Sequence, residues 1–400
     1  MGNGRRRARR GLVAGTIVLI AAAVLPAAAP ALVVGLGDQK PGVFSDQRLR
    51  GLGLRTARLT VSWDVATRDP QAVRTWLGAV RAAGLEPQIA FEHLPNERCP
   101  ASPCRAPSTA EYRSAAARFR ALFPEVTTLT TWNESNHQSQ PVSADPEAVA
   151  SYYGVLRGLC QKCTIVGADV LDSGRYVRWL ERFRAAAPEA RLYGLHNYGD
   201  VTYGTTAGVD AVLAAVPGTL WIEETGGIVT LRNEAGRITL STNEARAGAA
   251  IERAFTSALA RPRVTRLSVY QWTAPSGSRF DAGLIRADGS ERPSYAALRR
   301  GLASLPAWSG PVTIWTARLQ RPNRRRLLLT ASCDEACSGR VTVTIRGRRV
   351  ATRRYATGSS QVLRIAIPRS IRGQLLRSSQ RRAVIRTDAG MRSVVTIRLR

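Results

Sequence analysis

Histidine and lysine are scarce in this sequence, and metal-ligand clusters are hard to find. The 400 residues include three His, and Lys40 and Lys162 are the only lysines. A single C-x-x-C pair, Cys160 and Cys163, has the spacing of zinc ligands, but no second such pair accompanies it. A structural zinc site takes four Cys or His ligands, so zinc is the less favoured interpretation. We expect no metal or organic cofactor.

Long apolar runs are also scarce. Apart from residues 11–35, no segment is long and apolar enough to span a bilayer. Low-complexity tracts and internal repeats are absent, which argues against a disordered or repetitive architecture. A hydrophobic content of 44% is that of a globular protein, and 400 residues suffice for one large domain and a smaller one.

The N-terminus has the order of a secretory signal. MGNGRRRARR carries five Arg and no acid, Gly11 to Leu25 is uncharged and mostly apolar, and PAAAPA supplies small residues. Ala29 and Ala31 fit an A-x-A site with cleavage after Ala31, so residues 1–31 are predicted to be a signal peptide. The protein would then be secreted or bound at the cell surface. An uncleaved anchor over residues 11–35 is the alternative, and the prolines within it argue against that.

The six cysteines fall in three close pairs: Cys99 and Cys104, Cys160 and Cys163, Cys333 and Cys337. An even number of cysteines in an exported chain indicates disulfides. We therefore expect disulfide bonds at these positions.

Positive charge is concentrated in the C-terminal part. The net charge is +29, of which residues 305–400, with 21 basic and 3 acidic residues, contribute +18. Residues 32–304 contribute +6. So basic a module would attract anionic cell-wall polymers, lipid headgroups or nucleic acid, although its arginines are also compatible with a simple solvated face. Aromatic residues that stack on single-stranded nucleic acid are sparse there, which argues against nucleic acid as a partner.

From residue 32 onward, short apolar runs alternate with helical stretches. The runs are 32–37, 57–63, 85–91, 126–132, 163–169, 190–198, 219–224 and 265–272. Apolar stripes with helical spacing lie between them, such as Val73, Trp76, Leu77 and Val80. Eight repeats over about 270 residues predict a (β/α)8 TIM barrel over residues 32–305. An open doubly wound sheet is less favoured, because no G-x-G-x-x-G loop follows the first strand.

Beyond the linker PAWSGP, the hydrophobic period changes to two. Val341, Val343 and Ile345 alternate with threonines, and Val395, Ile397 and Leu399 follow the same pattern. Several short strands of this kind predict a small, basic, immunoglobulin-like β-sandwich over residues 311–400.

In a TIM barrel, the active site lies at the C-terminal ends of the strands. The polar and aromatic residues predicted at those ends are Trp63 and Asp64, Glu92 and His93, Asn133 and Glu134, His196, Asn197 and Tyr198, Glu223 and Glu224, and Gln271 and Trp272. Carboxylates, hydrogen-bond donors and aromatic faces together suit a sugar. Glu134 and Glu224 end strands on opposite sides of the barrel mouth, where two carboxylates can flank a glycosidic bond.

The motifs TWNESN, LHNYGD, LWIEETGG and YQWTA occur in the order of the strand 4, 6, 7 and 8 motifs of the clan A retaining glycoside hydrolases, which this chain resembles. RLTVSW resembles the strand 2 arginine motif of the clan, and residues 280–298 resemble its segment after strand 8. The resemblance covers most of residues 32–304. It implies an enzyme that hydrolyses O-glycosidic bonds of a poly- or oligosaccharide with retention.

Carried over to this chain, the resemblance implies that Glu134 is the general acid/base and Glu224 the nucleophile. Asn133 would bind the 2-hydroxyl of the sugar, and His196 the sugar or the acid/base. Tyr198 would donate a hydrogen bond to the nucleophile, Arg58 would keep the nucleophile ionised, and Trp272 would be the stacking platform. Trp63 and Glu92 are further substrate-contact candidates, against the alternatives of a core aromatic and a surface pair of Glu92 with His93.

Glu223 competes with Glu224 for the role of nucleophile. Successive strand residues point to opposite faces, so only one of them should point into the mouth. The W-I-x-E-x-G register favours Glu224, with Glu223 pointing outward or supporting the site from behind. A non-catalytic carbohydrate- or cell-wall-binding protein on the same scaffold is the alternative, and the presence of both glutamates argues against it.

Overall fold

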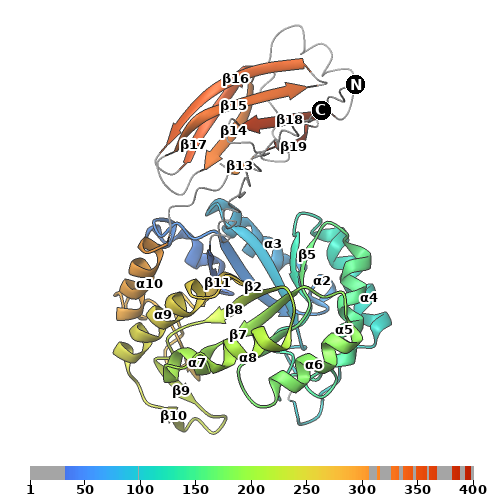
Figure 1. Cartoon of the computed structure of the whole chain (residues 1–400), viewed down its shortest axis with the longest axis vertical. Coiled ribbons are helices and arrows are strands. Elements are labelled where there is room, and N and C mark those ends of the chain that lie inside the picture. Colours follow the sequence, from blue (N-terminus) through green and yellow to red (C-terminus); the bar gives the residue numbers. More distant parts are fainter. Residues whose placement is uncertain are drawn as a thin grey trace, which may run out of the picture. The chain divides into compact units, whose positions relative to one another are not determined.

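The computed structural model describes residues 32–97 and 99–305, together with backbone strands between residues 313 and 397 (Figure 1). The predicted signal peptide and the pair Cys333 and Cys337 fall outside the residues whose side chains are described. Within the described part of the chain, no helix has the length and apolarity needed to cross a membrane.

A parallel sheet of nine strands forms a TIM-like barrel. In chain order these strands are β1 (Val33–Gly37), β2 (Thr56–Ser62), β3 (Glu86–Glu92), β4 (Thr128–Thr130), β5 (Thr164–Val166), β6 (Asp169–Leu171), β7 (Leu192–His196), β8 (Thr219–Thr225) and β11 (Val264–Tyr270). They are ordered β5-β4-β3-β2-β1-β11-β8-β7-β6. All eight predicted runs are therefore strands of this sheet, and the fifth run is divided between β5 and β6.

The fifth run forms the two edge strands of this sheet. β5 pairs with β4, whereas β6 pairs with β7. Gly167 and Ala168 connect the two pieces, and Gly167 N donates to Leu192 O of β7. The nine-stranded barrel is thus nearly closed, and the fifth run supplies the strands at its two edges.

Helices follow the staves and cover the barrel (Figure 1). They are η1 (Pro41–Ser45), α1 (Gln47–Arg50), α2 (Val65–Arg68), α3 (Pro70–Ala82), α4 (Thr109–Leu122), α5 (Pro146–Leu159), α6 (Tyr176–Ala186), α7 (Tyr198–Tyr203), α8 (Ala207–Ala215), α9 (Glu244–Leu259) and α10 (Pro293–Ala303). The stripe predicted for α3 is its buried face. At the start of α5, the Asp145 side chain accepts from Ala148 N and Pro146 begins the helix, as the sequence predicts.

A small antiparallel sheet follows stave β8. It consists of β9 (Thr230–Arg232), β10 (Ile238–Leu240) and β12 (Phe280–Asp281), in the order β10-β9-β12. Because β12 lies in the segment after β11, this sheet joins the chain beyond stave β8 to the chain beyond the last stave.

The C-terminal strands form two antiparallel sheets. They are β13 (Thr313–Trp315), β14 (Arg326–Ser332), β15 (Cys337–Ile345), β16 (Arg348–Thr357), β17 (Ser360–Ala366), β18 (Arg381–Thr387) and β19 (Arg392–Ile397). One sheet has the order β13-β14-β17 and the other β16-β15-β18-β19. On β15, Val343 is fully buried while Thr342 and Thr344 are partly exposed, which agrees with the predicted period of two. An immunoglobulin-like packing of the two sheets remains a prediction.

Disulfides join two of the three cysteine pairs. Cys99 bonds to Cys104 in the loop after β3, and Cys160 bonds to Cys163 between α5 and β5. The disulfide prediction is therefore confirmed for these pairs, and the sulfurs of the C-x-x-C pair bind each other.

Candidate active site

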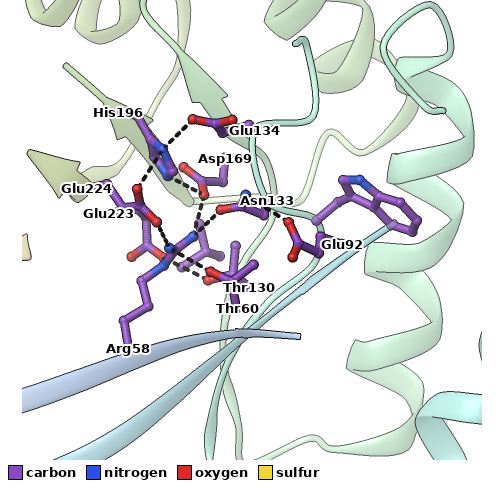
Figure 2. A network of polar contacts seen from close by, with 12 residues as sticks. Arg58, Thr60, Glu92, Thr130, Asn133, Glu134, Asp169, His196, Glu223 and Glu224 are labelled. Atoms are coloured by element: carbon purple, nitrogen blue, oxygen red, sulfur yellow. Dashed lines mark hydrogen bonds and ion pairs between the residues drawn. The ribbon is translucent and has the colours of Figure 1, made fainter. Parts of the chain in front are cut away.

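Arg58 is the centre of a buried network of charged side chains at the C-terminal end of the barrel (Figure 2). Its Nε donates to Glu223 Oε2 at 3.0 Å, and its Nη1 donates to Glu224 Oε1 at 2.5 Å. Its Nη2 donates to Asn133 Oδ1 at 2.8 Å and to Asp169 Oδ2 at 2.9 Å. Although Arg58 stands early in β2, its side chain is long enough to reach the ends of the neighbouring staves.

The ionisation of Arg58 is secured by its neighbours. Burial alone would lower the pKa of this guanidinium, but the charges of Glu224, Asp169 and Glu223 outweigh burial and raise it. A delocalised, forked cation can bond several carboxylates at once, which a lysine ammonium on one stem does less well.

His196, the last residue of β7, joins the two candidate catalytic glutamates. Its Nδ1 lies 3.1 Å from Glu134 Oε1 and 3.6 Å from Glu224 Oε2. The distance between Glu134 Oε1 and Glu224 Oε2 therefore cannot exceed the sum of these two distances. The chain folds these side chains, from the ends of two staves separated by three βα units, onto one ring nitrogen (Figure 2).

Glu134 occupies an unusual backbone conformation. Its φ is 44°, and it is the only non-glycine residue of the described chain with a positive φ. Hydrogen bonds fix the residues on either side, because Asn133 N donates to Phe91 O and Ser135 N donates to Asp169 O. A non-glycine residue in this region costs about 1–3 kcal/mol and is commonly held in place at functional sites.

Glu223 and Glu224 both face the network, contrary to the expected alternation. The pairing of β8 shifts register here: Leu195 pairs with Ile222, but His196 pairs with Glu224. The pairing with β11 also shifts between Ile222 and Thr225. An irregularity of this kind inserts an extra residue into the strand, so neighbouring side chains can point to the same side. Strict alternation of the two side chains therefore does not hold, and Glu223 lies behind the site, which is one of the two positions expected for it.

The two glutamates nevertheless differ in access. Glu223 is fully buried, and its Oε2 accepts from Arg58 Nε, from Thr130 Oγ1 at 2.7 Å and from Gln88 Nε2. Glu224 has 11% of its side chain exposed, and its Oε2 accepts from the Tyr198 hydroxyl at 3.2 Å. Glu224, unlike Glu223, can therefore be reached from the barrel mouth.

Glu92 is a third carboxyl group near the two candidates. It ends β3, and Asn133 Nδ2 donates to its Oε2 at 3.5 Å. Burial raises the pKa of Glu92 to about 7; His93 opposes this effect, and Glu134 and Glu224 reinforce it. Glu92 therefore belongs to the network, and a simple surface pair with His93 does not describe it.

The protonation of Glu134 responds to His196. Burial would raise the pKa of Glu134, but the hydrogen bond and the charge of His196 outweigh burial and lower it. The described cluster thus contains five carboxyl groups, and all of them except Glu92 contact Arg58 or His196: Glu92, Glu134, Asp169, Glu223 and Glu224.

Trp272 is not at the mouth, and its predicted role as a stacking platform is not supported. It is 2% exposed, its ring packs edge-on against Tyr295, and its Nε1 donates to Asp46 Oδ2 at 3.1 Å. An indole buried in this way offers no face to a sugar. The strand ends two residues earlier than the sequence indicates, so Tyr270 is the aromatic residue at the end of β11.

Tyr270 is partly exposed and lies near the carboxyl cluster. Burial raises the pKa of its hydroxyl, and the charge of Glu224 adds to this effect. Its ring is 6.0 Å from that of Phe280, which in turn contacts Tyr198 edge-on at 5.0 Å. Trp63 lies at the end of β2, where its backbone N–H donates to Glu92 O, and it is partly buried against the core.

Asp169 is the residue of the network that sequence reasoning missed. Asp169 ends the predicted run 163–169, although in the structure it is the first residue of β6. The criterion that selected the other rim residues would therefore have selected it. No motif of the clan resemblance includes it, and for that reason it was not singled out.

A hollow of about 400 Å³ lies apart from this network. It is lined by residues that follow β1 and β11, including Ser45, Asp46, Arg48, Thr273 and Arg286. None of the lining residues belongs to the carboxyl cluster. The candidate active site is therefore defined by the chemistry of the cluster and not by this hollow.

Comparison with known proteins identifies the class of the barrel. Residues 106–294 match the family model described as glycosyl hydrolase catalytic core. The resemblance noted in the sequence is thus confirmed, and the protein is an enzyme that carries a glycosyl hydrolase catalytic core. No curated protein matches the chain in sequence.

Solved structures show the same fold at low sequence identity. A GH39 beta-xylosidase from Caulobacter crescentus is 16% identical, with 86% of this chain and 95% of that chain covered and a TM-score of 0.51. A family 39 glycoside hydrolase from Bacteroides cellulosilyticus WH2 is 15% identical, with 84% and 81% covered and a TM-score of 0.50. A GH10 endoxylanase from a sugarcane soil metagenome is 11% identical, with 68% and 97% covered and a TM-score of 0.50. Identities this low establish the fold alone.

Proposed function

We propose that the protein is an exported retaining glycoside hydrolase that cleaves O-glycosidic bonds in a poly- or oligosaccharide. The observation that carries this proposal is the contact of Glu134 and Glu224 with the same nitrogen of His196. A separation limited in this way suits the about 5–5.5 Å of a retaining pair better than the about 6.5–9.5 Å of most inverting pairs.

In this mechanism Glu224 attacks the anomeric carbon while Glu134 donates a proton to the leaving oxygen. The bond to the leaving sugar breaks, and a covalent glycosyl–enzyme intermediate forms on Glu224. Glu134, now a carboxylate, takes a proton from water, which attacks the anomeric carbon and releases Glu224. The two groups therefore need opposite ionisation in the first step.

The surrounding residues supply that asymmetry. Arg58 and Tyr198 both donate hydrogen bonds to Glu224, as a nucleophilic carboxylate requires. The proton on Glu134 is held less firmly in the free enzyme, because His196 favours the carboxylate. Leaving-group oxygen placed against Glu134, together with exclusion of water by the sugar, would restore the protonated form.

The other residues of the rim bind the sugar in this proposal. Asn133 has its Oδ1 fixed by Arg58 and its Nδ2 next to Glu92, and in this proposal Nδ2 binds the sugar 2-hydroxyl. Tyr270 takes the stacking role that the sequence assigned to Trp272, with its ring at the end of the last stave. Trp63 and Glu92 flank the other side of the site.

The test is a panel of aryl glycosides assayed with the wild type, Glu134→Gln, Glu224→Gln and a control, Glu147→Gln. Glu147 is an exposed residue of α5, paired with Arg182. We expect Glu224→Gln to be inactive and Glu134→Gln to lose about 10²–10⁴-fold, more for poor leaving groups than for good ones. A mechanism-based 2-fluoro sugar should label Glu224 in the wild type. Full activity of both site variants would refute the proposal.

Export and attachment belong to the same proposal. The basic, apolar and small-residue order of residues 1–31 supports cleavage after Ala31, so the mature protein would begin at Leu32. The basic C-terminal module would hold the enzyme at an anionic cell-wall polymer. Mass determination of the N-terminal peptide of the secreted protein distinguishes a cleaved signal from a retained anchor.

A further inference from the structure

Asp169 lies between Arg58 and His196 in the candidate active site, yet neither the clan resemblance nor the proposed mechanism assigns it a role. It is the first residue of β6 and is fully buried. Both of its ion pairs use one oxygen: Oδ2 accepts from Arg58 Nη2 at 2.9 Å and lies 3.0 Å from His196 Nε2. Because this buried carboxylate contacts both Arg58 and His196, it can affect the orientation and charge of each (Figure 2).

The fold makes room for this carboxylate. Gly194 of β7 pairs with Asp169, and a Cβ at residue 194 would lie 2.6 Å from Asp169 Oδ1 and 2.7 Å from Glu223 Cγ. Any larger residue at position 194 would displace one of these acids. Glycine on the neighbouring stave is thus a packing requirement of the buried acid pair.

The second nitrogen of His196 connects Asp169 to catalysis. Nε2 faces Asp169, and Nδ1 faces Glu134 and, less closely, Glu224. Both nitrogens of a histidine are donors only when the ring carries two protons. With an acidic oxygen at each nitrogen, that charged form satisfies both contacts, whereas a neutral ring leaves one carboxylate without a donor.

Every charged group around the ring acts in a known direction. Burial alone would lower the pKa of His196, but the charges of Asp169 and Glu224 and the hydrogen bonds of Asp169 and Glu134 raise it well above its ordinary value. Arg58 keeps its charge in ion pairs with Asp169, Glu223 and Glu224. Burial and the charge of Glu223 raise the pKa of Asp169, while His196 and Arg58 lower it.

We propose that Asp169 is a positioning residue that fixes the His196 ring and holds it as a doubly protonated imidazolium, with one N–H committed to Asp169 and the other to the acid/base Glu134. Through His196, Asp169 sets how readily Glu134 gives up its proton. The assignment of Glu134 rests on the proposed function, but the state of the His196 ring does not.

Nitrogen-15 NMR of the full-length protein labelled at histidine tests the state of the ring directly. The chain has only three histidines, so His93→Asn and His137→Asn assign the remaining signal to His196. We expect the wild-type His196 to keep both ring protons at neutral pH. In Asp169→Asn we expect the ring to become neutral at a pH lower by about one unit or more, because the paired anion is gone.

Asp172→Asn is the matched control. Asp172 lies three residues further on and is also largely buried, but its oxygens accept from Gly199 N and Asp200 N and do not contact His196. We expect the His196 titration to shift less in this variant than in Asp169→Asn, because Asp172 acts on His196 only through its charge and makes no hydrogen bond to the ring. An equal shift in both variants would refute a specific role of Asp169, and a neutral wild-type His196 at pH about 7 would refute the proposal even if Asp169→Asn fails to fold.

A kinetic measurement tests whether the protonation state of the His196 ring changes the pH at which Glu134 loses its proton. With a neutral His196, Glu134 loses a cationic neighbour and keeps its proton to a higher pH. The alkaline limb of kcat/KM should therefore move upward in Asp169→Asn, and kcat should fall roughly tenfold or more with little change in KM. A uniform loss of activity with an unchanged pH profile would indicate a merely structural role and overturn the proposal.

The outcomes separate this inference from the proposed function. If wild-type enzyme hydrolyses no glycoside but His196 behaves as expected, the function fails and the role of Asp169 in holding the ring stands. If the enzyme is active and His196 titrates in Asp169→Asn as it does in the wild type, the inference alone fails.

Discussion

At the scale of single residues, the site is governed by a shortage of cations. Arg58 serves Glu223, Glu224 and Asp169 together, and His196 serves the remaining contacts of Asp169 and Glu134. Glu92 has neither cation within bonding distance among the described contacts, and its nearest polar contact is the amide of Asn133. Burial raises the pKa of Glu92 to about 7, which is the expected response of a buried acid with little compensating charge.

We therefore predict that Glu92→Gln changes the pH dependence of stability. Burial, opposed by His93, raises the pKa of Glu92 from 4.5 to about 7, so between these values the folded state binds a proton that the unfolded state has released. The contribution of Glu92 to stability is then present below pH 4.5 and is lost as the pH rises through 7. Glutamine does not titrate, so the free energy of unfolding of Glu92→Gln should rise relative to that of the wild type as the pH increases.

Urea unfolding at about pH 5 and about pH 8 measures the difference. Glu86→Gln, at the exposed opposite end of β3, is the control and should show the same gap to the wild type at both pH values. A gap between Glu92→Gln and wild type that does not change with pH would contradict the prediction.

At the scale of elements, strand ends and helix starts place the catalytic groups. The irregular pairing of β8 turns Glu223 and Glu224 to the same side. The loop after β4 holds Glu134, with its positive φ, close to His196. The helices that hold these staves in place begin at ordinary caps. In α4, Ser108 Oγ accepts from Glu111 N, and Glu111 Oε2 accepts from Ser108 N, which forms a capping box.

Ser108→Ala should lower the free energy of unfolding by about 1 kcal/mol, because Glu111 N loses its acceptor at the start of the helix. Ser114→Ala, an exposed position within the same helix, should change it by less than about 0.5 kcal/mol. Urea unfolding of both variants measures the two effects. Equal effects would show that the capping contact contributes nothing of its own.

At the scale of the whole molecule, charge is divided unevenly between the barrel and the C-terminal region. Residues 305–400 carry +18 of the net charge of +29, against +6 for residues 32–304. The antiparallel strands place many of these arginines along extended segments, such as Arg348, Arg349, Arg353 and Arg354 on β16. A glycosyl hydrolase core next to so basic a region suits the proposal that the enzyme is held on an anionic polymer.

We predict that the full-length protein binds poly-glutamate beads with an affinity that falls as salt rises, because the attraction is screened. Replacing seven arginines of the C-terminal region by glutamine should weaken binding; these are Arg324, Arg325, Arg326, Arg348, Arg349, Arg353 and Arg354. The control replaces the same number of exposed arginines on the barrel helices. If the C-terminal variant and the control variant bind the beads equally well, the binding role of this region is contradicted.

Much of the fold could be predicted because buried elements leave a periodic pattern. The eight apolar runs are strands because parallel staves are buried on both faces, and the stripe of α3 is its buried face for the same reason. The third disulfide pair, Cys333 and Cys337, and the sandwich packing stay predictions. Side chains at the ends of predicted strands, such as Glu134, His196 and Glu224, could be grouped correctly because parallel strands end on one face of a barrel.

The sequence by itself determined the staves, the helix faces and the set of acidic and basic groups at one end of the barrel, because each depends on local periodicity. Tertiary structure alone decided which way those groups point. The irregular pairing of β8 brought Glu223 inward, the strand end at Tyr270 left Trp272 in the core, and the division of the fifth run into β5 and β6 placed Asp169 between Arg58 and His196. Register and bulges arise from contacts between strands far apart in sequence, and no local pattern records them.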